Sequence, residues 1–376
     1  ECVSWVNESF RMKYEAQLPA KISVHPQGND FFTSMPALLP QPYRFFGVKE
    51  VCRINGREPA LSSDILLYDS ITGHLLALMD GDWITTMRTG AVAALSIDKL
   101  KKSDAHTFSF IGLGNTARAT AMCLLSLYAN KDVKFRLLRY KDQADSFIER
   151  FQEYTNALFE IVDTVQELIS GAEIIISCIT DASDLICTDN TLYNKGVLLV
   201  PVHTRGFQNC DLFFDKIYGD DRGHVCGFKN FSKFRAFDEF SNVLLNRNPG
   251  RENDKERIIA YNIGLGLHDI LFACKIYERL NKAQFPFFMQ EKETAKFWIV
   301  IGRRLWCDWY DYDFYSHIKY IYRWRVWLCP DSENKSNNKG LFNHFLLEYF
   351  LLNRIIYRFI FLCSIYSIFL QITLIE

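Results

Sequence analysis

The sequence has almost no net charge. Its 43 Lys and Arg residues are balanced by 44 Asp and Glu residues, which gives a formal net charge of -1 at pH 7, and no Lys/Arg run or basic helix stands out. Proteins that bind nucleic acid usually present a basic patch, because contacts to phosphate supply much of the affinity. The composition therefore argues against nucleic acid as a partner.

Closely spaced cysteine pairs are also missing. The 11 cysteines include no C-x-x-C motif, are odd in number, and are scattered through predicted strands and helices. Disulfide frameworks and zinc sites favour even numbers or close pairs of cysteines. We therefore expect reduced, buried thiols, no metal site and a reducing, cytoplasmic location.

No targeting segment stands out at the start of the sequence. Residues 1–15 lack the continuous apolar core of a signal peptide, so export is not expected. The sequence does not begin with Met, and its first residue is therefore not taken as the natural start.

The length of 376 residues and a hydrophobic content of 49% suffice for two domains and an extension. From residue 300 the chain is rich in aromatic and apolar residues with little periodic order, and we expect residues 300–376 to be poorly folded. A reading-frame shift or read-through past residue 299 is the preferred explanation. A membrane anchor at residues 359–375 is the less favoured alternative, because this apolar stretch is shorter than the roughly 20 residues that span a bilayer.

The most informative motif is a glycine turn between an apolar run, residues 107–111, and a helical pattern. Gly112 suits the tight turn, Gly114 lets the backbone approach a pyrophosphate, and Ala117 allows the helix to pack closely on a sheet. Phosphates bind at such helix N-termini. The motif predicts a dinucleotide site, whereas a glycine-bearing turn without a ligand is the alternative. The predicted cofactor residues here are Gly112, Gly114, Asn115, Thr116 and Ala117.

Further apolar segments alternate with helical patterns after this turn. They span residues 133–138, 159–162, 174–179 and 197–202. Strands that alternate with helices are typical of a parallel sheet. The predicted fold class is α/β, with a Rossmann-type doubly wound parallel sheet.

The end of the second strand indicates which dinucleotide binds. An acidic residue about 20 residues past the glycines takes the ribose hydroxyls in NAD sites, whereas an Arg can accommodate a 2′-phosphate. Arg139 and Lys141 lie at this position, and Asp142 comes slightly late for the acidic role. NADP(H) is therefore favoured over NAD(H), unless Arg139 and Lys141 simply face solvent.

The hundred residues before the glycine turn have a different pattern. Residues 65–69 and 74–80 read as two strands joined by a turn of hairpin length. Small residues then open a helix that continues to Leu100, which places Arg88 near a helix N-terminus.

At this segment the sequence resembles the ornithine cyclodeaminase and mu-crystallin family, and the resemblance covers residues 1–299. It rests on the runs at 79–81 and 87–94, on the glycine turn, and on shorter matches at 34–39, 47–49, 171–178 and 264–269. The resemblance implies a homodimer in which the parallel sheet is inserted into a discontinuous α+β substrate and dimerisation domain. We place the first part of that domain at 1–103, the dinucleotide domain at 104–236 and the return segment at 237–299. Within the return segment, residues 258–280 read as one long helix with Gly264 and Gly266 packed inside it.

The resemblance also assigns roles in a small amino-acid or imine site. Lys49 and Arg88 match members of a basic cluster that holds the substrate carboxylate, and Lys49 also counts as catalytic. Lys21 stands where the family usually has an Arg, and Thr89 is assigned to the cofactor. A planar Arg fork suits bidentate binding of a carboxylate. Surface salt bridges are the alternative for Lys49 and Arg88.

The catalytic Asp of the family falls on Asp220, just past the last strand of the dinucleotide domain. Such a residue can take a proton from the substrate amine, and the adjacent Asp221 would raise one of the two pKa values. Ordinary loop or capping residues are the alternative. His203 and His224 are interpreted as loop histidines without a partner.

The activity implied by the resemblance is NAD(P)-dependent hydride transfer at the Cα–N bond. Ornithine conversion to proline and ammonia is the type reaction, and relatives run parts of it as ketimine reductases or amino-acid dehydrogenases. A mu-crystallin-like protein that binds small ligands with NADP(H), without turnover, is the alternative of another class.

Overall fold

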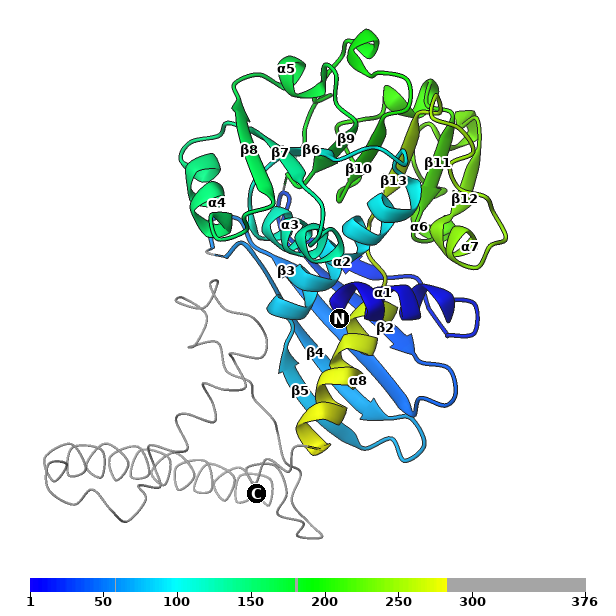
Figure 1. Ribbon diagram of the computed structural model, residues 1–376. Helices are drawn as coiled ribbons and strands as arrows, with labels where there is room; N and C mark the ends of the chain where they lie inside the picture. Colours follow the sequence, from blue (N-terminus) through cyan, green and yellow to red (C-terminus); the bar gives the residue numbers. More distant parts are fainter. Residues whose placement is uncertain (58, 180–181, 283–376) are drawn as a thin grey trace, which may run out of the picture. The chain divides into compact units, whose positions relative to one another are not determined.

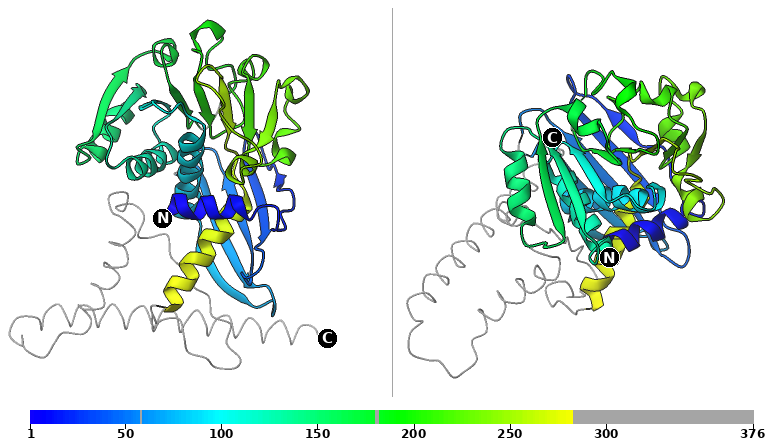
Figure 2. Two further views of the ribbon diagram at one scale, coloured as in Figure 1. Left: turned by 45° about the vertical axis from the view of Figure 1, so that its right-hand side comes forward. Right: turned by 45° about the horizontal axis from the view of Figure 1, so that its top comes forward.

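The computed structural model describes residues 1–282 except residue 58 and residues 180–181. An antiparallel sheet has the strand order β1-β2-β3-β4-β5, and α8 packs on its strands β2, β3 and β4 (Figures 1 and 2). At Gly47 an added Cβ would lie 2.6 Å from Ile270 of α8, so the helix approaches the sheet too closely for a side chain there. The elements of this part are α1 (Cys2–Arg11), β1 (Ile22–Val24), β2 (Phe31–Leu38), β3 (Phe45–Arg53), β4 (Leu61–Asp69), β5 (Leu75–Asp80), α2 (Asp82–Leu100) and α8 (Gly266–Lys282).

The second sheet is parallel and eight-stranded, in the order β12-β11-β13-β10-β9-β6-β7-β8. This confirms the predicted fold class. The strands are β6 (Thr107–Ile111), β7 (Val133–Leu138), β8 (Ala157–Val162), β9 (Ile174–Ser177), β10 (Leu198–Pro201), β11 (Lys216–Gly219), β12 (Phe237–Glu239) and β13 (Ile258–Tyr261). The α-helices are α3 (Asn115–Leu127), α4 (Gln143–Phe151), α5 (Val165–Ile169), α6 (Arg222–Val225) and α7 (Phe240–Leu244), and short 3₁₀ turns cover Asn190–Leu192, Cys210–Leu212 and Phe231–Lys233.

The prediction of one helix over residues 258–280 is wrong at its start. Ile258–Tyr261 is the strand β13, which pairs with β10 and β11 inside the parallel sheet, and α8 begins only at Gly266. All four residues of β13 are buried, so no alternation of exposure marks them as a strand. Strands β12 and β13 therefore lie beyond the boundary predicted at residue 236, and the alternation of strands and helices does not stop there.

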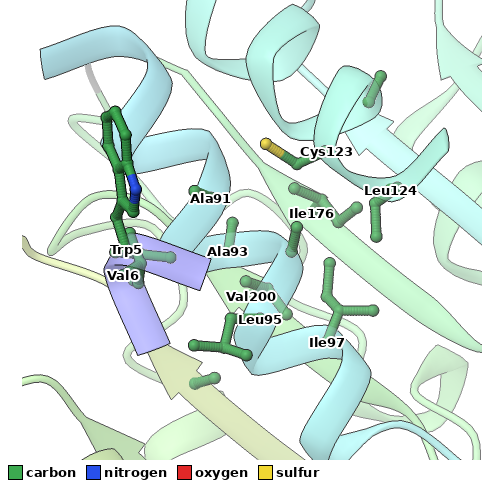
Figure 3. Packing of buried hydrophobic residues seen from close by; sticks show 14 of the residues in the cluster. Trp5, Val6, Ala91, Ala93, Leu95, Ile97, Cys123, Leu124, Ile176 and Val200 are labelled. Atoms are coloured by element: carbon green, nitrogen blue, oxygen red, sulfur yellow. The ribbon is translucent and has the colours of Figure 1, made fainter. Parts of the chain in front are cut away.

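The two sheets are joined by a shared core around α2. An added Cβ at Gly90 would lie 2.5 Å from the backbone of Ala119, so α2 and α3 cross backbone to backbone. Figure 3 shows side chains of α1, α2 and α3 packed with Ile176 and Val200 of the parallel sheet. A rigid helix thus connects the antiparallel sheet to the strand–turn–helix unit of the parallel one.

The predictions about the hairpin, the cysteines and the C-terminal extension have different outcomes. The hairpin is confirmed as β4 and β5, and Cys123, Cys187, Cys210 and Cys274 are free and buried, whereas Cys226 is exposed. Within the described part of the chain, no helix is both long enough and apolar enough to cross a membrane. The expected extension at 300–376 and its apolar stretch lie outside the described residues.

Candidate active site

The glycine turn lies at the carboxyl end of β6. Gly112 has φ +80°, and a Cβ there would lie 3.0 Å from the backbone of Cys178 and of Ile179, so glycine is required. Gly114 caps α3 without a side-chain hydrogen bond, and nothing lies within 4 Å of where its Cβ would be. Open space at a helix N-terminus fits a pyrophosphate.

The strand order supports this assignment. From β6 the chain moves outward to β7 and β8, and it then returns to β9 on the other side of β6. In open α/β sheets, ligands bind beyond the carboxyl ends of the strands where the order reverses in this way. Asn115 and Thr116 open α3 at this point, and Ala117 is fully buried beneath it. Thr89 donates its hydroxyl hydrogen bond to Thr85 within α2, and its cofactor role stays a prediction.

Arg139 follows β7 at the same edge of the sheet. Its Nε donates to Asp163 at 2.6 Å, and both side chains are largely exposed. This hydrogen bond raises the Arg139 pKa. A 2′-phosphate at this position would compete with Asp163 for the guanidinium, and the preference for NADP(H) stays a prediction.

Asp220 lies just past β11, at the carboxyl edge, and is fully buried. Its Oδ2 accepts a hydrogen bond from the Gly264 backbone at 2.5 Å, and its Oδ1 has no hydrogen-bond partner among the described residues. Burial raises the Asp220 pKa to about 6. The prediction that Asp221 would do this is wrong, because Asp221 is paired with Lys13 at 2.9 Å.

The structure reveals a buried ionic cluster that joins three elements. Asp269 of α8 accepts from Nε of Arg88 at 2.9 Å and forms an ion pair with Nζ of Lys49 at 2.8 Å. The exposed fractions are 5% for Arg88, 1% for Lys49 and 0% for Asp269. We call these three residues the clamp. The alternative of surface salt bridges is wrong, and the pairing partner is a buried carboxylate.

The charges of the clamp perturb one another. Burial, and then the neighbouring Arg88, lower the Lys49 pKa to about 7. Burial alone would raise the Asp269 pKa, but Arg88 and Lys49 together lower it. The clamp therefore holds an ionised carboxylate, a permanent cation and a lysine that titrates near neutral pH.

Asp220 and the clamp are neighbours through Gly264. Gly264 has φ +91°, and an added Cβ would overlap Nη1 of Arg88, while its N–H donates to Asp220. Lys21 is half-buried, and burial lowers its pKa, while Asp220 and Arg88 both act on it electrostatically. The structure thus brings Lys21, Lys49, Arg88 and Asp220 together, and their roles in a substrate site stay predictions.

A cavity of about 250 Å³ opens beside these groups. Its wall contains the cation Lys21, the paired Asp221 and His224, together with apolar side chains. The apolar and backbone contributors are Leu18, Pro19, Ala20, Met35, Pro36, Gly223, Leu265 and Gly266.

Two features of the site escaped the sequence reasoning. Asp269 was not singled out, although a lone carboxylate inside the apolar core face of a helix was a usable signal. His203, interpreted as a loop histidine without a partner, hydrogen-bonds Ser177 at 2.7 Å, and burial lowers its pKa to about 4.

The sequence model of the ornithine cyclodeaminase/mu-crystallin family matches residues 1–284. The chain belongs to this family. The nodulation efficiency protein NfeD of Rhizobium meliloti is 23% identical to this family member over 273 residues, which are 69% of the chain and 83% of that protein. A Delta(1)-pyrroline-2-carboxylate reductase of Bacillus cereus is 27% identical over 233 residues, 57% of the chain and 70% of the reductase.

Solved structures share the fold. The Delta(1)-pyrroline-2-carboxylate reductase of Thermococcus litoralis, in complex with NADH and L-proline, is 22% identical with a TM-score of 0.67, and the match covers 75% of the chain and 93% of that structure. An archaeal alanine dehydrogenase dimer with bound NAD is 21% identical with a TM-score of 0.67, covering 78% and 94%. Both structures therefore share the fold of this chain, and the insertion of one domain into the other stays a prediction.

Proposed function

We propose that this family member is an NAD(P)-dependent enzyme that transfers hydride at the Cα–N bond of a small amino acid or of the corresponding cyclic imine. The observation that carries the proposal is the clustering of the clamp, Lys21 and Asp220, in which Lys21 also lines the cavity. Reductases and dehydrogenases among the relatives and fold neighbours support the same reaction class.

The charge of the clamp favours a carboxylate ligand. Lys49 and Arg88 share the single carboxylate of Asp269, and Lys21 adds a third cation nearby. Buried charges are stable only when they are paired. A substrate carboxylate would neutralise the excess cation, and the planar fork of a guanidinium suits such a group.

Asp220 is suited to handle the proton on the substrate nitrogen. Its pKa of about 6 lets it accept and release a proton near neutral pH, and its Oδ1 lacks a protein partner among the described residues. Lys49, with a pKa of about 7, is the second group able to exchange a proton there.

NAD(P) supplies the hydride carrier when bound, and the residues of the glycine turn fit it. Gly112 allows the tight turn, Gly114 leaves room for the backbone approach, and α3 presents its N-terminus. Arg88 lies on α2 just before Gly90, where α2 crosses the helix that starts at this turn. This crossing holds the clamp and the cofactor turn on one rigid frame.

A panel of substrates tests the proposal. Cyclodeamination of ornithine, oxidation of an amino acid and reduction of a ketimine share the hydride step, so we would follow nicotinamide absorbance with L-ornithine, L-alanine, L-proline and Delta(1)-pyrroline-2-carboxylate. Turnover with at least one is expected. Tight dinucleotide binding without turnover of any would instead favour a mu-crystallin-like binding protein.

We also propose that the face of the antiparallel sheet opposite α8 forms a homodimer interface. Two cross-strand pairs on this face are apolar, with Phe46 and Tyr68 rings 5.9 Å apart and Val48 opposite Leu66, and the pair Glu50 and Asp64 follows them on the same face. Apolar patches of this kind mark interaction surfaces, and one fold neighbour is described as a dimer. Light scattering should give a dimer for the parent and a monomer for Val48→Glu, and a monomeric parent would contradict this interface.

A further inference from the structure

We infer that the cavity beside the clamp receives the substrate side chain and selects a side chain that carries no ammonium group. This inference rests on the proposed function and narrows its substrate class. It sets diamino acids such as ornithine apart from amino acids or imines whose side chain is uncharged. The selection depends on which charges in the cavity wall are already paired.

Asp221 is the carboxylate in the cavity wall, and both of its oxygens are engaged. Oδ2 pairs with Nζ of Lys13 at 2.9 Å, and Oδ1 accepts from the Gly223 backbone at 2.7 Å, where Asp221 caps α6. Lys13 is 4% exposed and also contacts Glu239 at 2.8 Å, so Asp221 already has a buried ammonium partner. An incoming ammonium group would have to compete with Lys13 for Asp221.

The other polar groups of the wall do not replace that carboxylate. Lys21 is a cation and repels an ammonium group, and the wall is otherwise apolar apart from His224. Asp220 is not part of the cavity wall, and its free Oδ1 is assigned to the α-nitrogen. A buried ammonium group without a counter-ion is strongly unfavourable.

His224 supplies the polar contact that remains. Burial lowers its pKa to about 4, so the imidazole is neutral at neutral pH, with Lys21 and Lys13 opposing its protonation and Asp221 and Glu239 favouring it. Its Nδ1 is buried and has no hydrogen-bond partner among the described residues. A neutral imidazole accepts or donates one hydrogen bond, which suits an uncharged substrate side chain or a ring edge.

A matched pair of ligands tests the inference. L-norvaline and L-ornithine share the same carbon chain and differ only in the terminal ammonium group. Their dissociation constants would be measured by calorimetry on the full chain saturated with NAD(P)⁺. We expect the dissociation constant of norvaline to be lower than that of ornithine by about tenfold or more, because the ammonium group of ornithine is left unpaired in the cavity.

A substitution in the cavity wall should reverse this order of affinities. His224→Asp places a free carboxylate in the cavity and should lower the ornithine dissociation constant while raising that of norvaline. His74→Asp makes the same change at an exposed histidine in the β4–β5 turn and should leave both constants unchanged. Equal binding of the two ligands by the parent chain would overturn the inference, whatever the variant does.

The possible outcomes distinguish a failure of the side-chain selection from a failure of the proposed function. Turnover of Delta(1)-pyrroline-2-carboxylate together with equal norvaline and ornithine affinities would overturn the selection while leaving the proposed function in place. Absence of binding of both ligands would overturn the inference together with the assignment of the clamp to a substrate carboxylate. A tenfold preference that His224→Asp reverses would support the cavity as the specificity pocket.

Discussion

Replacing Asp269 by Asn should test the clamp most sharply, because the change removes a charge without changing the shape. Asp269 is fully buried between Lys49 and Arg88, at 2.8 and 2.9 Å. Breaking a buried ion pair by removing one partner typically costs about 3–5 kcal/mol, because the remaining charge stays desolvated. The Asn side chain still accepts from Arg88 Nε, so no cavity forms and the loss is electrostatic.

The loss should depend on pH through Lys49. Its folded-state pKa is lowered to about 7 from 10.5, so the unfolded chain binds more protons between these values and stability rises with pH across that window. Asp269 raises the Lys49 pKa, so the Asn variant lowers it further and extends the window below pH 7. Each further unit corresponds to about 1.4 kcal/mol.

Urea unfolding of the parent and of Asp269→Asn, at about pH 6 and about pH 9, measures this effect. We expect a difference in free energy of unfolding of about 3–5 kcal/mol at the lower pH, and a smaller one at the higher pH, where Lys49 is already neutral. Asp163→Asn removes the exposed partner of Arg139 and serves as the matched control, with a much smaller effect. A loss that is equal at both pH values, or no larger than that of the control, would refute the reasoning.

Three further variants address the reacting groups. Arg88→Lys should lower kcat/KM by about 100-fold, because a point charge replaces the planar fork, while nicotinamide fluorescence titration should give unchanged dinucleotide affinity; undiminished turnover would exclude a carboxylate role. Arg139→Asp should reverse a preference for NADP(H) over NAD(H) in the same titration, and equal affinities in both proteins would contradict the assignment of Arg139 to a 2′-phosphate. Asp220 must lose its proton to act as a base, so kcat/KM for amino-acid oxidation should rise with pH through about 6. Asp220→Asn should remove that limb and slow the reaction by about 10²–10⁴-fold, and an unchanged pH profile in the variant would assign the limb to another group.

Local sequence patterns predicted much of the fold. Strands β6 and β7 and the glycine turn between β6 and α3 were correctly placed, because alternation and glycine positions are local properties. β13 was mistaken for helix because a short, fully buried run has no periodicity that separates strand from helix. Its neighbours in the sheet, β10 and β11, come from earlier in the chain, and only tertiary pairing reveals its place.

Site residues that belong to a recognisable motif could be predicted from the sequence, whereas those placed by tertiary packing could not. Lys49 and Arg88 were found through the family resemblance, but Asp269, which joins them, lies far away in sequence. A raised pKa was expected for one of the adjacent residues Asp220 and Asp221, and it is Asp220 that shows it, through burial and not through repulsion by Asp221. Contacts between distant segments determine both features, and such contacts produce no recognisable pattern in the local sequence.

The position of β13 has a consequence for the order in which the protein can assemble during its synthesis. The strand lies between β10 and β11, so the parallel sheet has a gap near its middle until residue 261 has left the ribosome. The loop that follows it brings Gly264 to Asp220, and α8 then delivers Asp269 to the clamp. Long-range parallel pairing is slow and exposes unpaired strand edges. We therefore expect the nascent chain to have two open edges at β10 and β11 until β13 closes the sheet, and α8 to complete the ionic cluster only after that.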